Sequence, residues 1–158
     1  MKGDPKVIEY LQEVLTGELT AINQYFLHAE MMDNWGYKRL SAKTRKESIE
    51  EMVHAEKLLE RMLYLDGSPN MKNLFQLRIG QNVKEQIQND LQVEYEAVPR
   101  LNKAINAAVE AGDNGSRDLF ESILKDEEEH VDYLEAQLHL IQEMGYENYL
   151  AQHIHKED

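Results

Sequence analysis

The chain of 158 residues contains no cysteine, so the sequence excludes disulfides, zinc ribbons, iron–sulfur clusters and thiol catalysis. It also has no run approaching 18 apolar residues, the length that a membrane-spanning helix requires. Its opening residues, MKGDPKVIEYLQ, are charged at once and offer no apolar signal region. We therefore expect a soluble, cytoplasmic protein that neither spans nor is anchored in a membrane.

Basic residues are scarce, with 17 Lys and Arg against 30 Asp and Glu, which gives a formal net charge of −13. A nucleic-acid partner is disfavoured, because contacts with phosphates need a basic face. The charge is compatible with attracting cations, although solubility alone would also explain it. A hydrophobic content of 42% is enough for a core, and the length predicts a single domain over residues 1–158.

Only three prolines and eight glycines interrupt the chain, and between their clusters the apolar residues recur with the 3.6-residue period of a helix. The first predicted helix begins at Asp4-Pro5, an N-cap followed by a proline suited to a first turn. The sequence predicts an all-α protein with helices over about 4–35, 38–65, 83–111 and 116–144 and a short fifth helix over about 147–155.

The predicted connections favour two antiparallel hairpins, because tight turns join the first helix to the second and the third to the fourth. Residues 66–82 form a longer link, which at about 3.3 Å per residue reaches roughly 55 Å. A helix of about 28 residues is roughly 42 Å long, so this link can cross the whole bundle. We expect a four-helix bundle with one long crossover, a pseudo-two-fold relation between the hairpins and a short C-terminal helix.

Charged residues interrupt the apolar stripe of every long helix. Glu18 lies in the stripe of the first helix, and Glu94 in that of the third. Glu127 and His130 interrupt the fourth, and the second carries Glu47, Glu51, His54 and Arg61. Any one of these carboxylates could be a boundary residue or an ion pair, but several buried together would cost several kcal/mol each. Arg61 is the one clear cation available, which disfavours a plain bundle with a polar core.

The polar core positions form an internal repeat. Adding 76 to the numbers of Glu18, Glu51 and His54 gives Glu94, Glu127 and His130. Glu and His three residues apart share one helix face and can bind one metal. Four carboxylates balance the charge of two divalent ions, and the pattern is that of di-iron or di-manganese proteins. Oxygen ligands with one imidazole per metal favour iron or manganese over a closed zinc site.

The sequence resembles the bacterioferritins of the ferritin-like superfamily, through GELTAINQYFLH, ESIEEMVHAEKLLER, DLQVEYEA, SRDLFESILKDEEEHVDYLE and GYENYLAQHIH. The resemblance implies a ferroxidase centre that oxidises Fe(II) with dioxygen or peroxide and delivers ferric mineral to a hollow cage of twenty-four subunits built from dimers. The implied ligands of two iron ions per chain are Glu51 and Glu127 as bridges, Glu18 and Glu94 as terminal carboxylates, and the imidazoles of His54 and His130.

Met52 takes its meaning from the same resemblance. From residue type alone it would be a core or interface methionine. Its position matches the methionine with which bacterioferritins bind haem b, one from each of two subunits, and thioether ligation raises the reduction potential of haem iron. The implied role is electron delivery for iron release, with a small ferredoxin as donor and the apolar residues Pro69 and Leu77 as candidates for its docking surface.

Other positions adjust this picture. Tyr25 fits either a tyrosine that donates an electron or a core tyrosine bonded to a ligand carboxylate. Glu50 and Asp126 are expected to accept hydrogen bonds from the ligand histidines. Lys46 stands where some relatives carry a histidine, which puts an inner-surface iron site in doubt. We expect the remaining histidines at the surface or in pores: His28, His139, His153 and His155.

Three alternative functions remain in view. A haem-free ferritin would share the diiron site, and a haem spectrum would separate the two. A rubrerythrin-type peroxidase would normally add a cysteine-bound iron domain, and a DNA-protecting mini-ferritin places its ligands between subunits. The sequence leaves open which oxidant is preferred and whether the diiron site is a stable cofactor or a site through which iron passes to the mineral. It also leaves open whether the chain assembles alone or with a second subunit type.

Overall fold

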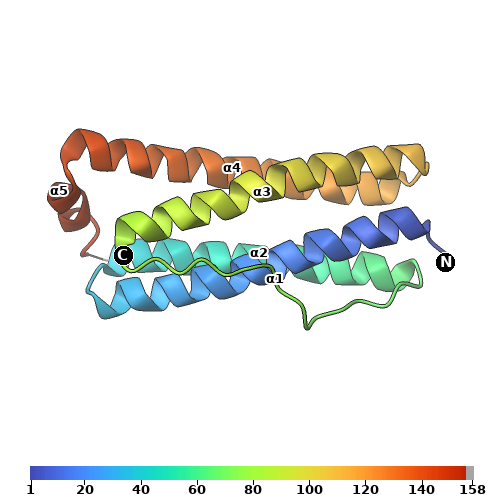
Figure 1. Cartoon of the computed structure of the whole chain (residues 1–158), viewed down its shortest axis with the longest axis horizontal. Coiled ribbons are helices and arrows are strands. Elements are labelled where there is room, and N and C mark those ends of the chain that lie inside the picture. Colours follow the sequence, from blue (N-terminus) through green and yellow to red (C-terminus); the bar gives the residue numbers. More distant parts are fainter. Residues whose placement is uncertain (156–158) are drawn as a thin grey trace.

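The computed structural model describes residues 1–155 and consists of helices joined by short turns and one long link (Figure 1). The all-α four-helix bundle with a short C-terminal helix is confirmed. Its helices are α1 Pro5–Asn34, α2 Lys38–Tyr64, α3 Val83–Glu110, α4 Asn114–Met144 and α5 Tyr146–Ala151. In the described part of the chain, no helix is long and apolar enough to cross a membrane.

Side-chain caps fix where the helices begin. The Asp4 carboxylate accepts hydrogen bonds from the backbone N–H groups of Lys6 and Val7, and Pro5 follows it as predicted. Asn82 caps α3 through the N–H of Glu85. Asp113 caps α4 through the N–H of Ser116, so this helix begins at Asn114, two residues before the predicted start.

The fifth helix is shorter than predicted and ends at Ala151. Beyond it, the backbone carbonyl of His153 accepts a hydrogen bond of 3.0 Å from the N–H of Arg39. That bond ties the end of the described chain to the first turn of α2. A continued helix would have used the carbonyl within its own ladder, and the sequence pattern gave no sign of this distant partner.

The hairpins pair as predicted, with α1 against α2, α3 against α4, and α1 against α3 across the bundle. The link between α2 and α3 runs back along the length of the bundle (Figure 1). It is fastened to α1 by its own backbone: the N–H of Phe75 donates to Thr20, that of Arg78 to Gln24 and that of Gly80 to His28.

The core has an apolar cluster towards each end of the bundle. One contains Leu11, Leu58, Leu101 and Phe120, and the other contains Met32, Ile87, Leu134 and Tyr149. The buried carboxyl groups of Glu18, Glu51, Glu94 and Glu127 lie at intermediate positions, one on each of the four long helices. The apolar ends therefore supply the packing that holds a charged layer in the middle.

Candidate metal centre

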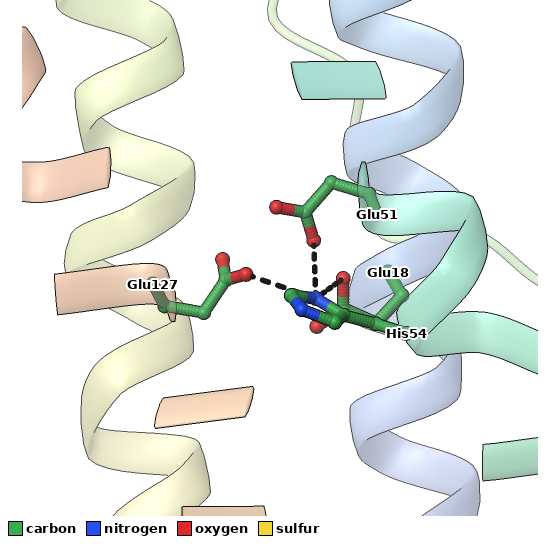
Figure 2. A group of neighbouring side chains, drawn as sticks. All are labelled: Glu18, Glu51, His54 and Glu127. Atoms are coloured by element: carbon green, nitrogen blue, oxygen red, sulfur yellow. Dashed lines mark ion pairs between the residues drawn. The ribbon is translucent and has the colours of Figure 1, made fainter. Parts of the chain in front are cut away.

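The structure brings together all six residues predicted as ligands, one or two from each long helix. Each of them is at most 6% exposed, so the middle of the bundle holds four carboxyl groups and two imidazoles away from water. Figure 2 shows Glu18, Glu51, His54 and Glu127 turned towards one another. The six predicted ligands are Glu18, Glu51, His54, Glu94, Glu127 and His130.

Three carboxylates surround the inner nitrogen of His54. Its Nδ1 lies 3.5 Å from Glu18 Oε2, 3.5 Å from Glu51 Oε2 and 3.2 Å from Glu127 Oε1. In this group of four residues, the atoms offered by each side chain all lie within 4.8 Å of one another. The spacing is suitable for a single cation between them.

A second group forms around His130 in the same way. Its Nδ1 lies 3.1 Å from Glu51 Oε1 and 3.6 Å from Glu94 Oε1. Glu51, Glu94, Glu127 and His130 again offer atoms within 4.8 Å of one another. Glu51 and Glu127 belong to both groups, and the shift of 76 residues converts one group into the other. The arrangement can therefore hold two cations side by side.

The outer nitrogens of the two histidines have acidic partners, as predicted. Nε2 of His54 lies 2.8 Å from Asp126 Oδ2, and Nε2 of His130 lies 2.9 Å from Glu50 Oε2. An acceptor at Nε2 favours a proton there, so Nδ1, which faces the carboxylates, is the nitrogen that would bind a cation. Positions 50 and 126 are also related by the repeat, so both halves orient their histidine by the same device.

Without a metal the site traps protons. Burial raises the pKa of Glu127 well above its usual value, and the charges of Glu51 and Glu94 add to the effect. Burial opposes the charged forms of Glu51 and His130 as well, but their mutual contact wins: it lowers the pKa of Glu51 to about 2 and raises that of His130 to about 12. The four carboxyl groups outnumber the two imidazoles that can carry a positive charge, so the metal-free layer retains protons on its carboxyl groups.

The buried polar atoms that lack a hydrogen bond concentrate in this layer. Within residues 1–155 there are ten such side-chain atoms, and seven of them belong to the six predicted ligands. Leaving buried polar atoms unsatisfied costs about 1–3 kcal/mol each, and a stable fold does not accumulate them without compensation. The seven are Glu18 Oε2, Glu51 Oε1 and Oε2, His54 Nδ1, Glu94 Oε2, Glu127 Oε1 and His130 Nδ1.

Comparison with known proteins gives the same picture. The profile of the ferritin-like domain matches residues 8–144. A bacterioferritin of Mycolicibacterium paratuberculosis is 54% identical over 152 residues, covering 96% of each chain. Bacterioferritin BfrA of Mycobacterium tuberculosis is 53% identical with the same coverage. The bacterioferritin of Brucella melitensis is 48% identical, covering 94% of this chain and 92% of its own.

The chain belongs to the bacterioferritin family. The resemblance inferred from its motifs is confirmed over nearly the whole chain. A bacterioferritin fold with a layer of buried carboxylates and imidazoles is thus established by two independent observations, the relatives and the geometry.

Tyr25 adds a neighbour to this bacterioferritin centre. It is fully buried, and its hydroxyl donates a hydrogen bond to Glu94 Oε1. Burial raises the pKa of Tyr25 well above its usual value, with Glu94 and Asp90 adding to the effect, so the phenol keeps its proton. The predicted bond to a ligand carboxylate is confirmed. A role as electron donor stays a prediction.

The expectation that His28 lies at the surface or in a pore is wrong, and the candidate cation Arg61 has a partner away from the centre. His28 is not at the surface: it is 0% exposed, its Nδ1 lies 2.8 Å from Asp90 Oδ1, and its Nε2 accepts from the N–H of Gly80. Arg61 does not neutralise the central carboxylates, because its Nη2 pairs with Asp113 Oδ1 at 2.7 Å near the end of the bundle. His139 and His155 are exposed as expected, and His153 is partly buried.

Sequence reasoning missed the buried acid Asp90, and it placed Glu47 on the apolar stripe of α2 without assigning it a role. Asp90 is 2% exposed and accepts from Gln24 and His28; Glu47 is 1% exposed, and burial raises its pKa to about 8. The repeat contained the signal, since the shift of 76 pairs Asp90 with Val14 and Glu47 with Ile123, both buried apolar residues. A polar residue opposite an apolar core position marks a buried group with its own partners.

Proposed function

We propose that this chain is an iron-storage protein whose centre is a ferroxidase. The observation that supports it is the set of seven unsatisfied atoms converging on two points within a buried layer. Carboxylate oxygens and single imidazoles suit iron or manganese, and the relatives are bacterioferritins, which favours iron.

The ligand set fits two Fe(II) ions as substrates. Glu51 and Glu127, which belong to both groups, would bridge the ions, while Glu18 with His54 and Glu94 with His130 would each hold one. The two ions give up one electron each. Dioxygen takes both electrons with two protons to become hydrogen peroxide, or peroxide takes them with two protons to become two waters. Delivering both electrons together avoids a free one-electron product.

The surface around Met52 fits haem b. Met52 is 58% exposed on α2, and Ile49, three residues earlier on the same face, is 55% exposed. An exposed thioether flanked by apolar side chains is suited to ligate haem iron against the apolar porphyrin. A haem held by Met52 and by the same residue of a second copy would supply electrons for releasing stored iron.

The assembly follows from the family. The proposed assembly is a cytoplasmic cage of twenty-four subunits built from dimers, of this chain alone or mixed with a second subunit type. A small ferredoxin is proposed as the electron donor, with Pro69 and Leu77 of the crossover as its contacts. Leu77 is 37% exposed and therefore accessible on the isolated chain. No nucleic-acid or membrane partner is proposed.

The experiment is the substitution Glu127→Ala, with Glu128→Ala as its matched control on the exposed face of the same turn. Stopped-flow absorbance should show Fe(II) oxidation slowed by more than about 100-fold in the first variant and unchanged in the control. Helical content should be the same in both, since burial makes the Glu127 carboxyl costly rather than stabilising. Unchanged oxidation in Glu127→Ala would refute the ferroxidase proposal.

A further inference from the structure

A small cavity lies between α1 and α3 on the Glu18 side of the centre. Gly17, Ala21 and Ala97 line it, and the carboxylates of Glu18, Glu51 and Glu127 form its inner end. Its volume of about 10 Å³ accommodates about one water molecule. A hydrated metal ion, which carries several waters, is too large for this space.

The Arg100 side chain lines the same cavity from α3. Its guanidinium lies over the ring of Phe75, 4.6 Å from the ring centroid. It also lies against the bare backbone of residue 17, since a Cβ added at Gly17 would meet Arg100 Nη1 at 2.6 Å. The glycine therefore makes room for the guanidinium at this cavity.

Arg100 has free donors. No hydrogen bond or ion pair to it is found among residues 1–155, although it is half-buried. Burial lowers the pKa of the Arg100 guanidinium, and the carboxylates of Glu13, Glu96 and Glu94 counter this from a distance. A guanidinium carries five N–H donors in a fixed plane, and none of them has a protein partner here.

The position related to Arg100 by the repeat is used differently. Subtracting 76 gives Gln24, which is 0% exposed and bonds to Asp90 Oδ1 at 2.8 Å and to the N–H of Arg78 at 3.0 Å. Tyr25 lies beside it on Glu94. The Glu94 side of the centre is therefore closed by a hydrogen-bonded network, whereas the Glu18 side has a cavity and a guanidinium that forms no hydrogen bond within residues 1–155.

We propose that Arg100 is a specificity-determining residue that admits hydrogen peroxide to the centre through this cavity and turns hydrated cations away. The inference rests on the ferroxidase function proposed above. Size and charge both act against a hydrated cation: the space holds about one water molecule, and the guanidinium repels Fe(II). Peroxide oxygens accept hydrogen bonds from a guanidinium, whereas dioxygen is a poor acceptor. Peroxide then takes two electrons from two Fe(II) ions and two protons, its O–O bond breaks, and two waters leave.

The test compares Arg100→Gln, Arg100→Lys and Gly17→Ala with the unaltered protein. The second-order rate of Fe(II) oxidation by peroxide without air should fall on the order of tenfold in Arg100→Gln, the loss of one charge-assisted hydrogen bond. The rate with dioxygen should stay within about twofold. The peroxide rate of Arg100→Lys should lie between those of Arg100→Gln and the unaltered protein, because lysine keeps the charge but lacks the planar set of donors. Gly17→Ala displaces the guanidinium without removing it and should lower the peroxide rate selectively.

A second readout does not depend on turnover. Fluoride, a water-sized anion, is titrated into Co(II)-loaded protein and followed by visible absorption; Arg100→Gln should weaken its binding on the order of tenfold. An equal fall of the peroxide and dioxygen rates, or no change in either, would overturn the proposal. If the unaltered protein shows no saturable Fe(II) oxidation, the proposed function fails, and the fluoride titration alone then decides whether Arg100 guards an anion port.

Discussion

Each histidine of the centre has two nitrogens with separate tasks. The outer Nε2 of His54 and of His130 bonds to an acid that is roughly half exposed, Asp126 or Glu50, while the inner Nδ1 faces buried carboxylates. The outer contact fixes the ring and its tautomer at modest cost, because that partner remains in contact with water. The inner carboxylates stay costly to bury until cations neutralise them.

Metal binding at this centre should release protons. The pKa of His130 is raised to about 12, and the pKa values of Glu127 and His54 are raised as well, so the metal-free centre holds protons that a cation must displace. Co(II) binding should therefore release at least one proton per chain and weaken as the pH falls. Calorimetry in two buffers of different ionisation enthalpy measures the number. Binding without proton release would contradict the description of the site.

At the scale of helices, the sequence was informative where the signal is local. Apolar periodicity and caps such as Asp4 predicted the long helices to within about two residues. The repeat predicted which polar residues would meet in the core. His28 could not be placed this way, because its partners Asp90 and Gly80 are far away in the sequence and come close only when the crossover lies along the bundle.

The crossover should depend on His28 for its stability. Because Gly80 donates to Nε2, Nδ1 carries the proton that bonds to Asp90, and the ring joins α1, α3 and the crossover. His28→Ala leaves a cavity, removes the acceptor of the Gly80 N–H and leaves Asp90 with the Gln24 bond, which should cost about 3 kcal/mol of unfolding free energy. Thermal unfolding of the metal-free protein tests this against His139→Ala, an exposed histidine whose loss should cost under about 0.5 kcal/mol. Equal effects of the two substitutions would show that the network does not stabilise the fold.

At the scale of the whole molecule, the two proposed sites place opposite requirements on one bundle. The proposed metal centre needs buried charge, and the proposed haem surface at Met52 needs exposed apolar groups. Ile49 and Met52 are more than half exposed, yet Glu51 between them is fully buried. One helix can serve both because adjacent residues point about 100° apart around its axis. The two surfaces can therefore be altered separately.

Removing the Met52 thioether should remove haem and leave iron oxidation intact. Met52→Leu, produced with haem available, should show no haem absorption, an unchanged Fe(II) oxidation rate and the same assembly size by gel filtration. Met71→Leu, which alters another exposed methionine in the crossover, should keep the haem. A normal haem spectrum in Met52→Leu would show that another residue holds the group.

The most direct test of the central claim is the stoichiometry of rapid Fe(II) oxidation. Fe(II) is titrated in small steps into metal-free protein in air and followed by stopped-flow absorbance. Because Glu51 and Glu127 are shared by two groups of ligands, the fast phase should saturate at about two irons per chain. Saturation near one iron, or no saturable fast phase, would contradict an assembled diiron centre.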